Sequence, residues 1–201
     1  MSRESILSAA LQFFAEYGYE GTSTSIAAKM GTNSTILFAY FGSLEALFLQ
    51  SLEESLARYA DRLEHLVQQC QGDSVQQQLY SLLYINALSS AEPEVALSRR
   101  ARWFPPPALS RHVQAQLARF DERLTGLLTK LFEEGRLRGE VHRTVPVSEL
   151  VALYQWLFLS LVQVEQGVFE RFWRGQIAPA FFRGEKEEQQ CTISGSLPCL
   201  F

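Results

Sequence analysis

Short hydroxyl and amide side chains around Gly31 are the first residues in this sequence that could bind another molecule. They are Thr22, Ser23, Thr24, Asn33, Ser34 and Thr35. Side chains of this kind accept hydrogen bonds from the free amides at helix N-termini, and capping alone would account for them. At a helix N-terminus they can also bind phosphate oxygens. Because all six flank one turn glycine, we favour a binding role and keep capping as the alternative.

Aromatic side chains form a second group of candidates. Phe41 lies four residues after Leu37, a spacing that points both into a core, whereas Phe38 and Tyr40 can serve either a core or a contact surface. Further along, six aromatic residues could line a cavity for a small apolar ligand. A helical stripe of aromatics can equally be core, so they are a pool of candidates rather than a site. The six are Tyr80, Tyr84, Trp103, Phe104, Phe120 and Trp156.

Other reactive residue types show no spacing that indicates a site. Arg99, Arg100 and Arg102 could hold an anion, but a solvated helix face explains such a run as well. The three histidines are far apart in the sequence and have no metal-ligand spacing. No nucleophile beside a base, paired carboxylates or glycine-rich phosphate loop is recognisable. We therefore expect no catalytic residue, no metal and no cofactor, and a protein that is not an enzyme.

The composition is that of an ordinary globular chain. Hydrophobic residues make up 47% and charged residues 20% of the 201 positions, and the net charge is −4. This charge argues against coating nucleic acid through bulk electrostatics, although a locally neutral face can still bind DNA. The three scattered cysteines and the absence of a signal sequence favour the cytoplasm. The most apolar run, 150–164, is too short for a membrane span, so no membrane partner is expected.

The elements that would position these residues are helices. An apolar stripe over residues 6–17 predicts a first helix that ends at Gly18. A short second helix carries Ile26, Ala27 and Met30, and a third follows Gly31 with Asn33 as its N-cap. Two short helices joined through a glycine predict a helix-turn-helix.

The rest of the chain also predicts helices, and no stretch alternates like a strand. Ser43 caps a long fourth helix, and four or five more follow Gly72. The segment 147–168 is apolar on nearly every face, so it must be covered on two sides, most simply by its own core and by a second copy of the chain. The prediction is an all-α homodimer with a helix-turn-helix domain at 1–48, a helical effector-binding and dimerisation domain at 49–184 and a polar tail at 185–201.

The stretch from Gly18 to Phe48 resembles the DNA-binding signature of the TetR family of bacterial transcriptional regulators. The matching features are the glycine-turn-threonine entry, the Ile-Ala pair, the turn glycine, the aromatic cluster 38–41 and the Glu-Ala-Leu-Phe that follows it. The resemblance implies a DNA-reading head, a variable helical domain with a small-molecule pocket and a dimer interface formed by the last two long helices.

The same resemblance implies roles for individual residues. The third helix would enter the major groove, where Ser34, Thr35, Phe38, Ala39 and Tyr40 match the family's DNA-facing positions. Thr22, Ser23 and Thr24 match positions that touch phosphate. Hydroxyl groups can bind base edges, and an aromatic ring such as Phe38 can meet a thymine methyl.

The sequence departs from the family pattern in its charges. Leu44 stands where the family usually has a phosphate-binding lysine, and residues 1–48 contain two cations, Arg3 and Lys29, against four glutamates. Each phosphate neutralised by a cation contributes about −0.9 to the slope of log affinity against log salt. We therefore expect DNA binding that is weaker or less dependent on salt than is usual for the family.

Two functional hypotheses follow. The first is a repressor that binds a palindromic DNA operator as a homodimer and is released by a small apolar effector. The second is a TetR-like scaffold that has weak or lost DNA binding and acts as a ligand-binding or protein-interaction module.

Overall fold

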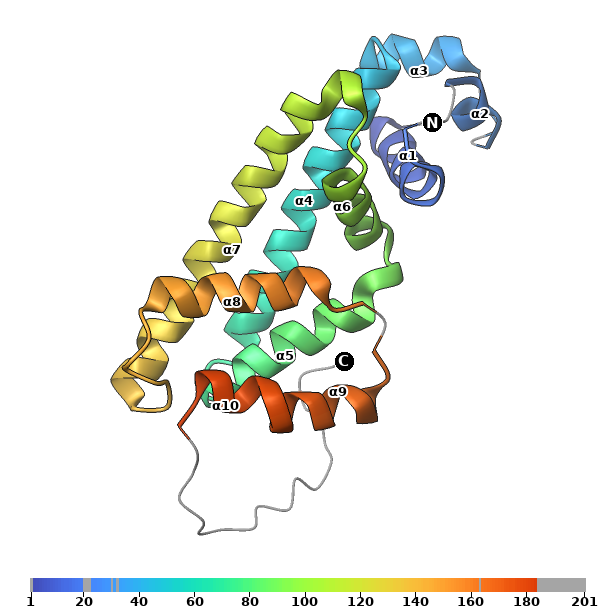
Figure 1. Cartoon of the computed structure of the whole chain (residues 1–201). Coiled ribbons are helices and arrows are strands. Elements are labelled where there is room, and N and C mark those ends of the chain that lie inside the picture. The colour runs from blue at the N-terminus through green and yellow to red at the C-terminus, as the bar shows by residue number, and fades with distance from the viewer. Residues whose placement is uncertain (1, 20–22, 30, 32, 163, 184–201) are drawn as a thin grey trace. The chain divides into compact units, whose positions relative to one another are not determined.

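The computed structural model describes residues 2–19, 23–29, 31, 33–162 and 164–183. Within these ranges the chain is helical and forms no strand beyond isolated bridges, which confirms the all-α fold class (Figure 1). The α-helices are α1 (Arg3–Tyr17), α2 (Ser23–Lys29), α3 (Ser34–Phe41), α4 (Leu44–Gln69), α5 (Val75–Leu88), α6 (Pro93–Trp103), α7 (Ser110–Arg138), α8 (Val147–Ser160), α9 (Gln166–Phe172) and α10 (Ala178–Phe181). Two short 3-10 turns, Ser89–Ala91 and Pro107–Leu109, and one π-helical turn, Trp173–Ile177, complete the order.

The chain divides into two compact units. Unit 1 comprises Met1–Asp61 with Ser89–Leu124, and unit 2 comprises Arg62–Leu88 with Thr125–Phe201. The boundary predicted at residue 48 falls inside α4, and the boundary at 184 lies at the edge of the described residues. The three-part domain division therefore remains a prediction, and the tail 185–201 lies outside the described residues.

In unit 1 the first helix has one buried apolar side, as its spacing predicted. Ile6, Ala10, Phe13 and Phe14 are buried, and the Phe14 ring meets Phe48 of α4 edge-on at 5.0 Å between centroids. The prediction was wrong for Tyr17, which is 51% exposed. It occupies the last turn of α1, where its ring lies 4.9 Å from that of Phe13 instead of entering the core.

Local signals define the ends of the first helices. Gly18 ends α1 at φ 75°, a backbone conformation that favours glycine. Asn33 caps α3 by accepting a hydrogen bond from the Ile36 amide at 3.0 Å, and Ser43 does the same for the Ala46 amide of α4 at 3.1 Å. All three ends were predicted from the sequence. The predicted inner-face residue Met30 lies outside the described residues.

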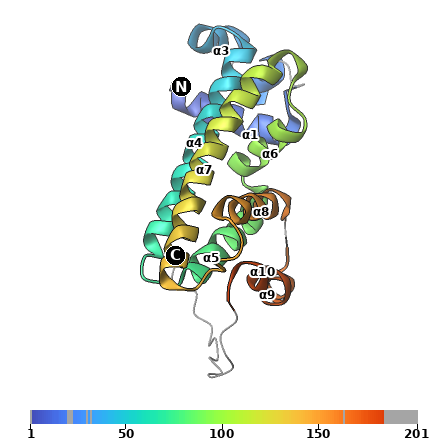
Figure 2. The same cartoon turned by 60° about the vertical axis from the view of Figure 1, so that its left-hand side comes forward.

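The remaining contacts of unit 1 join α6 and α7 to the first helices. The Ser55 hydroxyl of α4 donates to the Glu94 carbonyl of α6 at 3.1 Å, and the Gln116 amide of α7 donates to the Leu49 carbonyl of α4 at 3.1 Å. Arg102 of α6 forms a two-pronged ion pair with Asp121 of α7. Within this unit α4 and α7 lie side by side in Figures 1 and 2.

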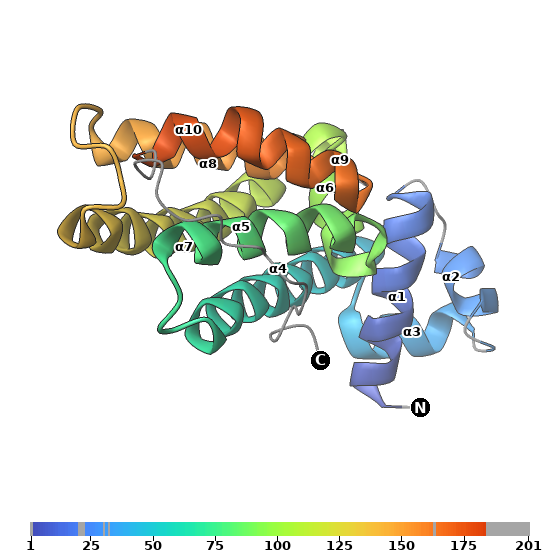
Figure 3. The ribbon, with the colours of Figure 1, turned by 90° about the horizontal axis from the view of Figure 1, so that it is seen from below.

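Unit 2 packs α5 against both α8 and the segment from α9 to α10. Two buried side-chain hydrogen bonds hold α5 to α8: Asn86 donates to the Phe158 carbonyl at 2.5 Å, and the Tyr154 hydroxyl donates to the Leu79 carbonyl at 2.6 Å. On its other side, α5 contributes Tyr80 to a ring contact with Trp173 at 5.4 Å. Figures 1 and 3 both show the α9 to α10 segment beside α5.

The apolar segment 147–168 is not one continuous helix, contrary to the prediction. The α8 helix ends at Ser160, Leu161 has extended backbone at ψ 124°, and α9 begins at Gln166. The Ser160 hydroxyl donates to the Trp156 carbonyl at 2.8 Å, an interaction that competes with the helical backbone pattern. The β-branched residues that follow also lower helix propensity.

In the part of the chain that the structure describes, no single helix is long and apolar enough to span a membrane. Among the described residues, one pair of helices, α3 and α4, is long and apolar enough when taken together, but it is bent by 64° at the break between them.

Candidate functional site

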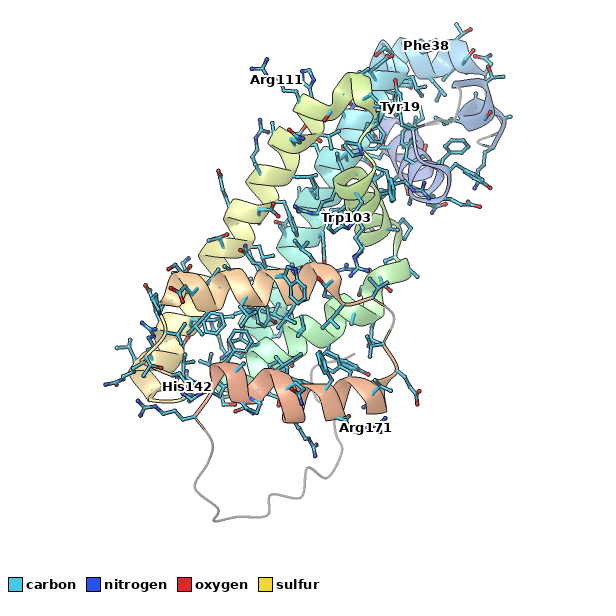
Figure 4. All side chains as sticks on the ribbon, viewed as in Figure 1. Tyr19, Phe38, Trp103, Arg111, His142 and Arg171 are labelled. Carbon is cyan, nitrogen blue, oxygen red and sulfur yellow. The ribbon has the colours of Figure 1, made fainter. Side chains whose placement is uncertain are left out.

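The outer surface of α3 is uncharged and partly aromatic. Leu37 and Phe41 face the core, while the exposed fraction is 41% for Phe38 and 48% for Tyr40. Thr35 and Ala39 are also exposed, Ser34 is half-buried, and Figure 4 shows Phe38 on the outer side of the helix. The structure therefore brings all five predicted DNA-facing residues of α3 onto one accessible helix.

The predicted phosphate-binding residues are described only in part. Thr22 lies outside the described residues, Ser23 begins α2, and Thr24 is exposed in its first turn. Asn33 is exposed and its side-chain oxygen caps α3, so the capping alternative holds for this residue. Leu44 is partly exposed at the start of α4.

One accessible residue of α3 was missed in the sequence. Ile36 is 39% exposed, and it lies one helical turn before Tyr40. The signal that could have identified it is this i, i+4 spacing. Because Leu37 and Phe41 form the inward pair, Ile36 and Tyr40 must lie on an adjacent, outward strip.

Both cations of the head are engaged in contacts within unit 1. The Lys29 ammonium lies 2.7 Å from the Glu16 carboxylate and 4.9 Å from the centre of the Tyr17 ring. The hydrogen bond between Lys29 and Glu16 lowers the pKa of Glu16 and raises that of Lys29.

Arg3 is held in the same way. Its guanidinium donates to the Gln50 side chain at 2.6 Å, lies 3.8 Å from the Glu54 carboxylate and covers the Phe41 ring at 5.4 Å. Neither cation of the head extends into solvent without a partner.

The start of α4 carries an acidic residue, Glu45, in its first turn. Glu45, next to Leu44, accepts a hydrogen bond from the Tyr19 hydroxyl at 3.2 Å. The pKa of its carboxyl is lowered, first by a backbone amide hydrogen bond and then by the Ser43 and Tyr19 hydroxyls. This helix N-terminus therefore already has an anionic partner from the protein.

The three neighbouring arginines of α6 do not form one site. Arg100 donates to the Glu16 carbonyl at 3.1 Å and lies against Gly18, while Arg102 pairs with Asp121. Arg99 is half-buried, and burial lowers the pKa of its guanidinium. The interpretation as a solvated helix face is therefore wrong for Arg102 and Arg99, because neighbouring helices supply their surroundings. Among the described residues there is also no cluster of ligands suited to a metal ion.

The predicted ligand-binding aromatics occupy several places. In unit 2, Tyr80 and Tyr84 stack at 5.8 Å and contact Phe169 at 5.3 and 5.1 Å, while Trp156 is 65% exposed. Burial raises the pKa of Tyr80 to about 12. In unit 1, Phe120 stacks on Tyr59, whereas Trp103 and Phe104 are 64% and 77% exposed.

A pocket of about 410 Å³ lies in unit 2, and none of the six aromatics lines it. Its walls combine apolar side chains with charged and amide groups. The lining residues are Val67, Gln71, Gly72, Gln78, Leu127, Lys130, Leu131, Glu134 and Arg138.

The helical fold and the glycine-turned pair α2 and α3, with an accessible outer surface on α3, define the helix-turn-helix class of DNA-binding proteins. Residues 6–50 match the family model described as bacterial regulatory proteins, tetR family. Residues 6–50 are thus a helix-turn-helix DNA-binding domain of this family, and the chain as a whole is similar to transcriptional repressors.

Individual relatives agree with this assignment. The chain is 29% identical over 143 residues to the transcriptional repressor AcnR of Corynebacterium efficiens, a match that covers 70% of this chain and 71% of that protein. Among solved structures, the fatty acid degradation regulator FadR from Bacillus halodurans matches with a TM-score of 0.62 and 19% identity, covering 80% of this chain and 81% of that one. A ketosteroid transcriptional regulator of Mycobacterium tuberculosis matches with a TM-score of 0.64 and 17% identity, covering 90% and 95%. At these identities the two structures show the fold alone.

Proposed function

We propose that the protein is a repressor that binds a palindromic DNA operator as a homodimer and leaves it when a small apolar effector binds. The outer surface of α3 carries this proposal. It is accessible, and it presents uncharged side chains that can enter the major groove of DNA. The similarity to a protein named as a repressor favours repression over activation.

The dimer proposal is supported by exposed apolar side chains on the last helices of unit 2. Leu153 and Trp156 of α8 are 43% and 65% exposed, and Val168 and Phe172 of α9 are 43% and 40% exposed. Each pair lies three or four residues apart, so each forms a strip on its helix. A second copy of the same strips would cover them about a two-fold axis, as in most homodimers. Gln155, next to Trp156, does not belong to this strip, because it donates to the Thr125 hydroxyl of α7 at 2.7 Å.

The effector proposal is supported by an aromatic cluster formed by α5, α9 and the π-helical turn that follows α9. Tyr80, Tyr84, Phe169 and Trp173 surround each other with ring centroids 5.1 to 6.5 Å apart. An apolar ligand that separated these rings would move α9 relative to α5 within unit 2. A ligand that favours one arrangement of the dimer and DNA that favours another must weaken each other's binding by the same factor.

The deciding experiment is a binding titration of the purified protein against duplex DNA from the region flanking its own gene, at low and at physiological salt. The proposal expects nanomolar binding that a specific palindrome competes, with a shallow dependence on salt. Binding no tighter than to unrelated DNA, in this region and in a wider genomic selection, would contradict it.

The second candidate is a scaffold with weak or lost operator binding. It is favoured by one observation, that Lys29 and Arg3 are both held by acceptors of the protein itself. The DNA titration separates the two candidates, because a scaffold would bind no duplex specifically. A scaffold would still bind an effector, and that binding would raise the melting temperature of the protein.

A further inference from the structure

The chemistry of α3 limits which base-pair features it can recognise. Ser34–Phe41 contains no arginine, lysine, asparagine, glutamine, aspartate or glutamate. These are the side chains that recognise guanine, adenine and cytosine through hydrogen bonds in the major groove. The hydroxyl groups of Ser34, Thr35 and Tyr40 remain, and a hydroxyl distinguishes bases poorly because it both donates and accepts.

The accessible face of α3 matches a different feature of the groove. Thr35, Phe38 and Ala39 are spaced i, i+3 and i+4, so they share one face, and all three are exposed. A threonine methyl, a phenylalanine ring and an alanine methyl are the groups that pack against the C5-methyl of thymine. We call Thr35, Phe38 and Ala39 the methyl-contact face.

The cations of the head do not replace the missing polar groups. Lys29 is 2.7 Å from Glu16, and Arg3 is 2.6 Å from the Gln50 side chain, so contact with a base would require each to give up its partner. Asn33, directly before α3, uses its side-chain oxygen to cap the helix, and the candidates Thr22, Ser23 and Thr24 offer hydroxyls rather than charged forks. Recognition by this head therefore depends on contacts between apolar groups.

We infer that the operator half-site is recognised through thymine methyl groups that the methyl-contact face buries in the major groove. This inference rests on the proposed function and specifies its DNA target: half-sites that place thymines opposite α3, on either strand. Removing one such methyl takes away the buried apolar surface of about one methylene group, which weakens binding about fourfold. Removing it from both half-sites of a palindrome weakens binding about 15-fold.

The test replaces thymine with deoxyuracil, which lacks only the C5-methyl and keeps its pairing with adenine. The DNA is a palindrome obtained by genomic selection. The two thymines at equivalent positions of its half-sites are replaced together, one position at a time, and affinity is measured by fluorescence anisotropy. The control replaces thymines in the flanks and in the centre between the half-sites. We expect about a 15-fold loss at one or more half-site positions and less than a twofold change in the controls.

A matched pair of protein variants assigns the methyl contact to a residue. Thr35→Ser removes the side-chain methyl and keeps the hydroxyl, whereas Thr35→Val keeps a methyl and removes the hydroxyl. At a thymine that Thr35 contacts, uracil should weaken binding by the wild type and Thr35→Val, and should have little further effect on Thr35→Ser. Phe38→Ala gives the same test for the ring, and its melting temperature shows whether the head remains folded.

The outcomes separate this inference from the function beneath it. If a specific palindrome is bound and uracil at every half-site position changes affinity less than twofold, the methyl inference is overturned and the repressor proposal stands. If no specific palindrome is bound, both are overturned. If uracil weakens binding equally in the wild type and in the Thr35→Ser and Phe38→Ala variants, neither the Thr35 methyl nor the Phe38 ring contacts the thymine methyls, and the inference is again overturned.

Discussion

Leu44 and its acidic neighbour make the N-terminus of α4 a poor partner for phosphate. Leu44 is partly exposed, and the Glu45 carboxylate is already supported by the Tyr19 hydroxyl. The helix dipole would attract a phosphate, but this carboxylate repels it. The weak point of the proposed interface is thus a single uncharged position beside an anion.

Replacing Leu44 with lysine is expected to tighten operator binding and to steepen its salt dependence. One added phosphate contact changes the slope by about −0.9, so a dimer changes it by about −1.8. The measurement is a set of titrations from low to physiological salt. Leu137→Lys, at an 86% exposed position of α7, is the matched control for added charge alone. Equal slopes for the two variants would argue against docking through α4.

The Glu16 and Lys29 pair gives a pH dependence whose sign is fixed. The folded pKa of Glu16 lies below its ordinary value of 4.5, first because Lys29 donates a hydrogen bond to it. Its contribution to stability is therefore present above pH 4.5 and is lost as the pH falls through the folded pKa. An NMR titration of the Glu16 carboxyl should show a midpoint below 4.5 that rises towards 4.5 in Lys29→Ala. An unchanged midpoint in that variant would rule out the pair as the cause.

At the scale of elements, the short helix α3 depends on its cap. Asn33 accepts the Ile36 amide at 3.0 Å, and an eight-residue helix has few other means of satisfying its first amides. Asn33 was a candidate for DNA contact as well as for capping. The two roles can be separated by variants that keep or remove the cap.

Asn33→Ala is expected to lower the free energy of unfolding by about 1 kcal/mol, and Asn33→Ser should restore most of it because serine also caps. Denaturant unfolding of the three proteins measures this. If Asn33 only caps, Asn33→Ser should bind the operator like the wild type. A large loss of operator affinity in a fully stable Asn33→Ser protein would instead assign Asn33 to the DNA contact.

Local signals predicted element ends well, and tertiary packing decided what they did not. The ends at Gly18, Asn33 and Ser43 depend on one residue and its neighbours, so the sequence was sufficient for them. The exposure of Tyr17 and the helix break at Leu161 depend on contacts and on competing backbone hydrogen bonds, which a spacing pattern does not contain. Similarly, the sequence indicated which aromatic residues could bind a ligand, but not which of them are packed together. Tyr80 lies among other aromatic rings, whereas Trp103 is exposed.

At the scale of the whole molecule, the apolar strips of α8 and α9 predict assembly. A single charge in the strip should prevent a second copy from covering it, because an unpaired charge would be buried. Trp156→Glu is therefore expected to shift the protein from dimer to monomer in sedimentation analysis. It should also weaken binding to the palindrome about tenfold or more, because two linked heads bind more tightly than one. Leu137→Glu is the control, and a dimeric Trp156→Glu protein would place the interface elsewhere.

The contact of Arg100 with the end of α1 has a consequence for how the head folds. The last turn of α1 contains no basic residue, and Arg100, 84 positions further along the chain, donates to the Glu16 carbonyl there and lies over Gly18. A cation at a helix C-terminus satisfies free carbonyls and opposes the negative end of the dipole. A peptide of residues 1–48 would lack this partner. We therefore expect the N-terminal helix-turn-helix domain to fold less stably when it is transplanted alone onto another protein than it does within this chain.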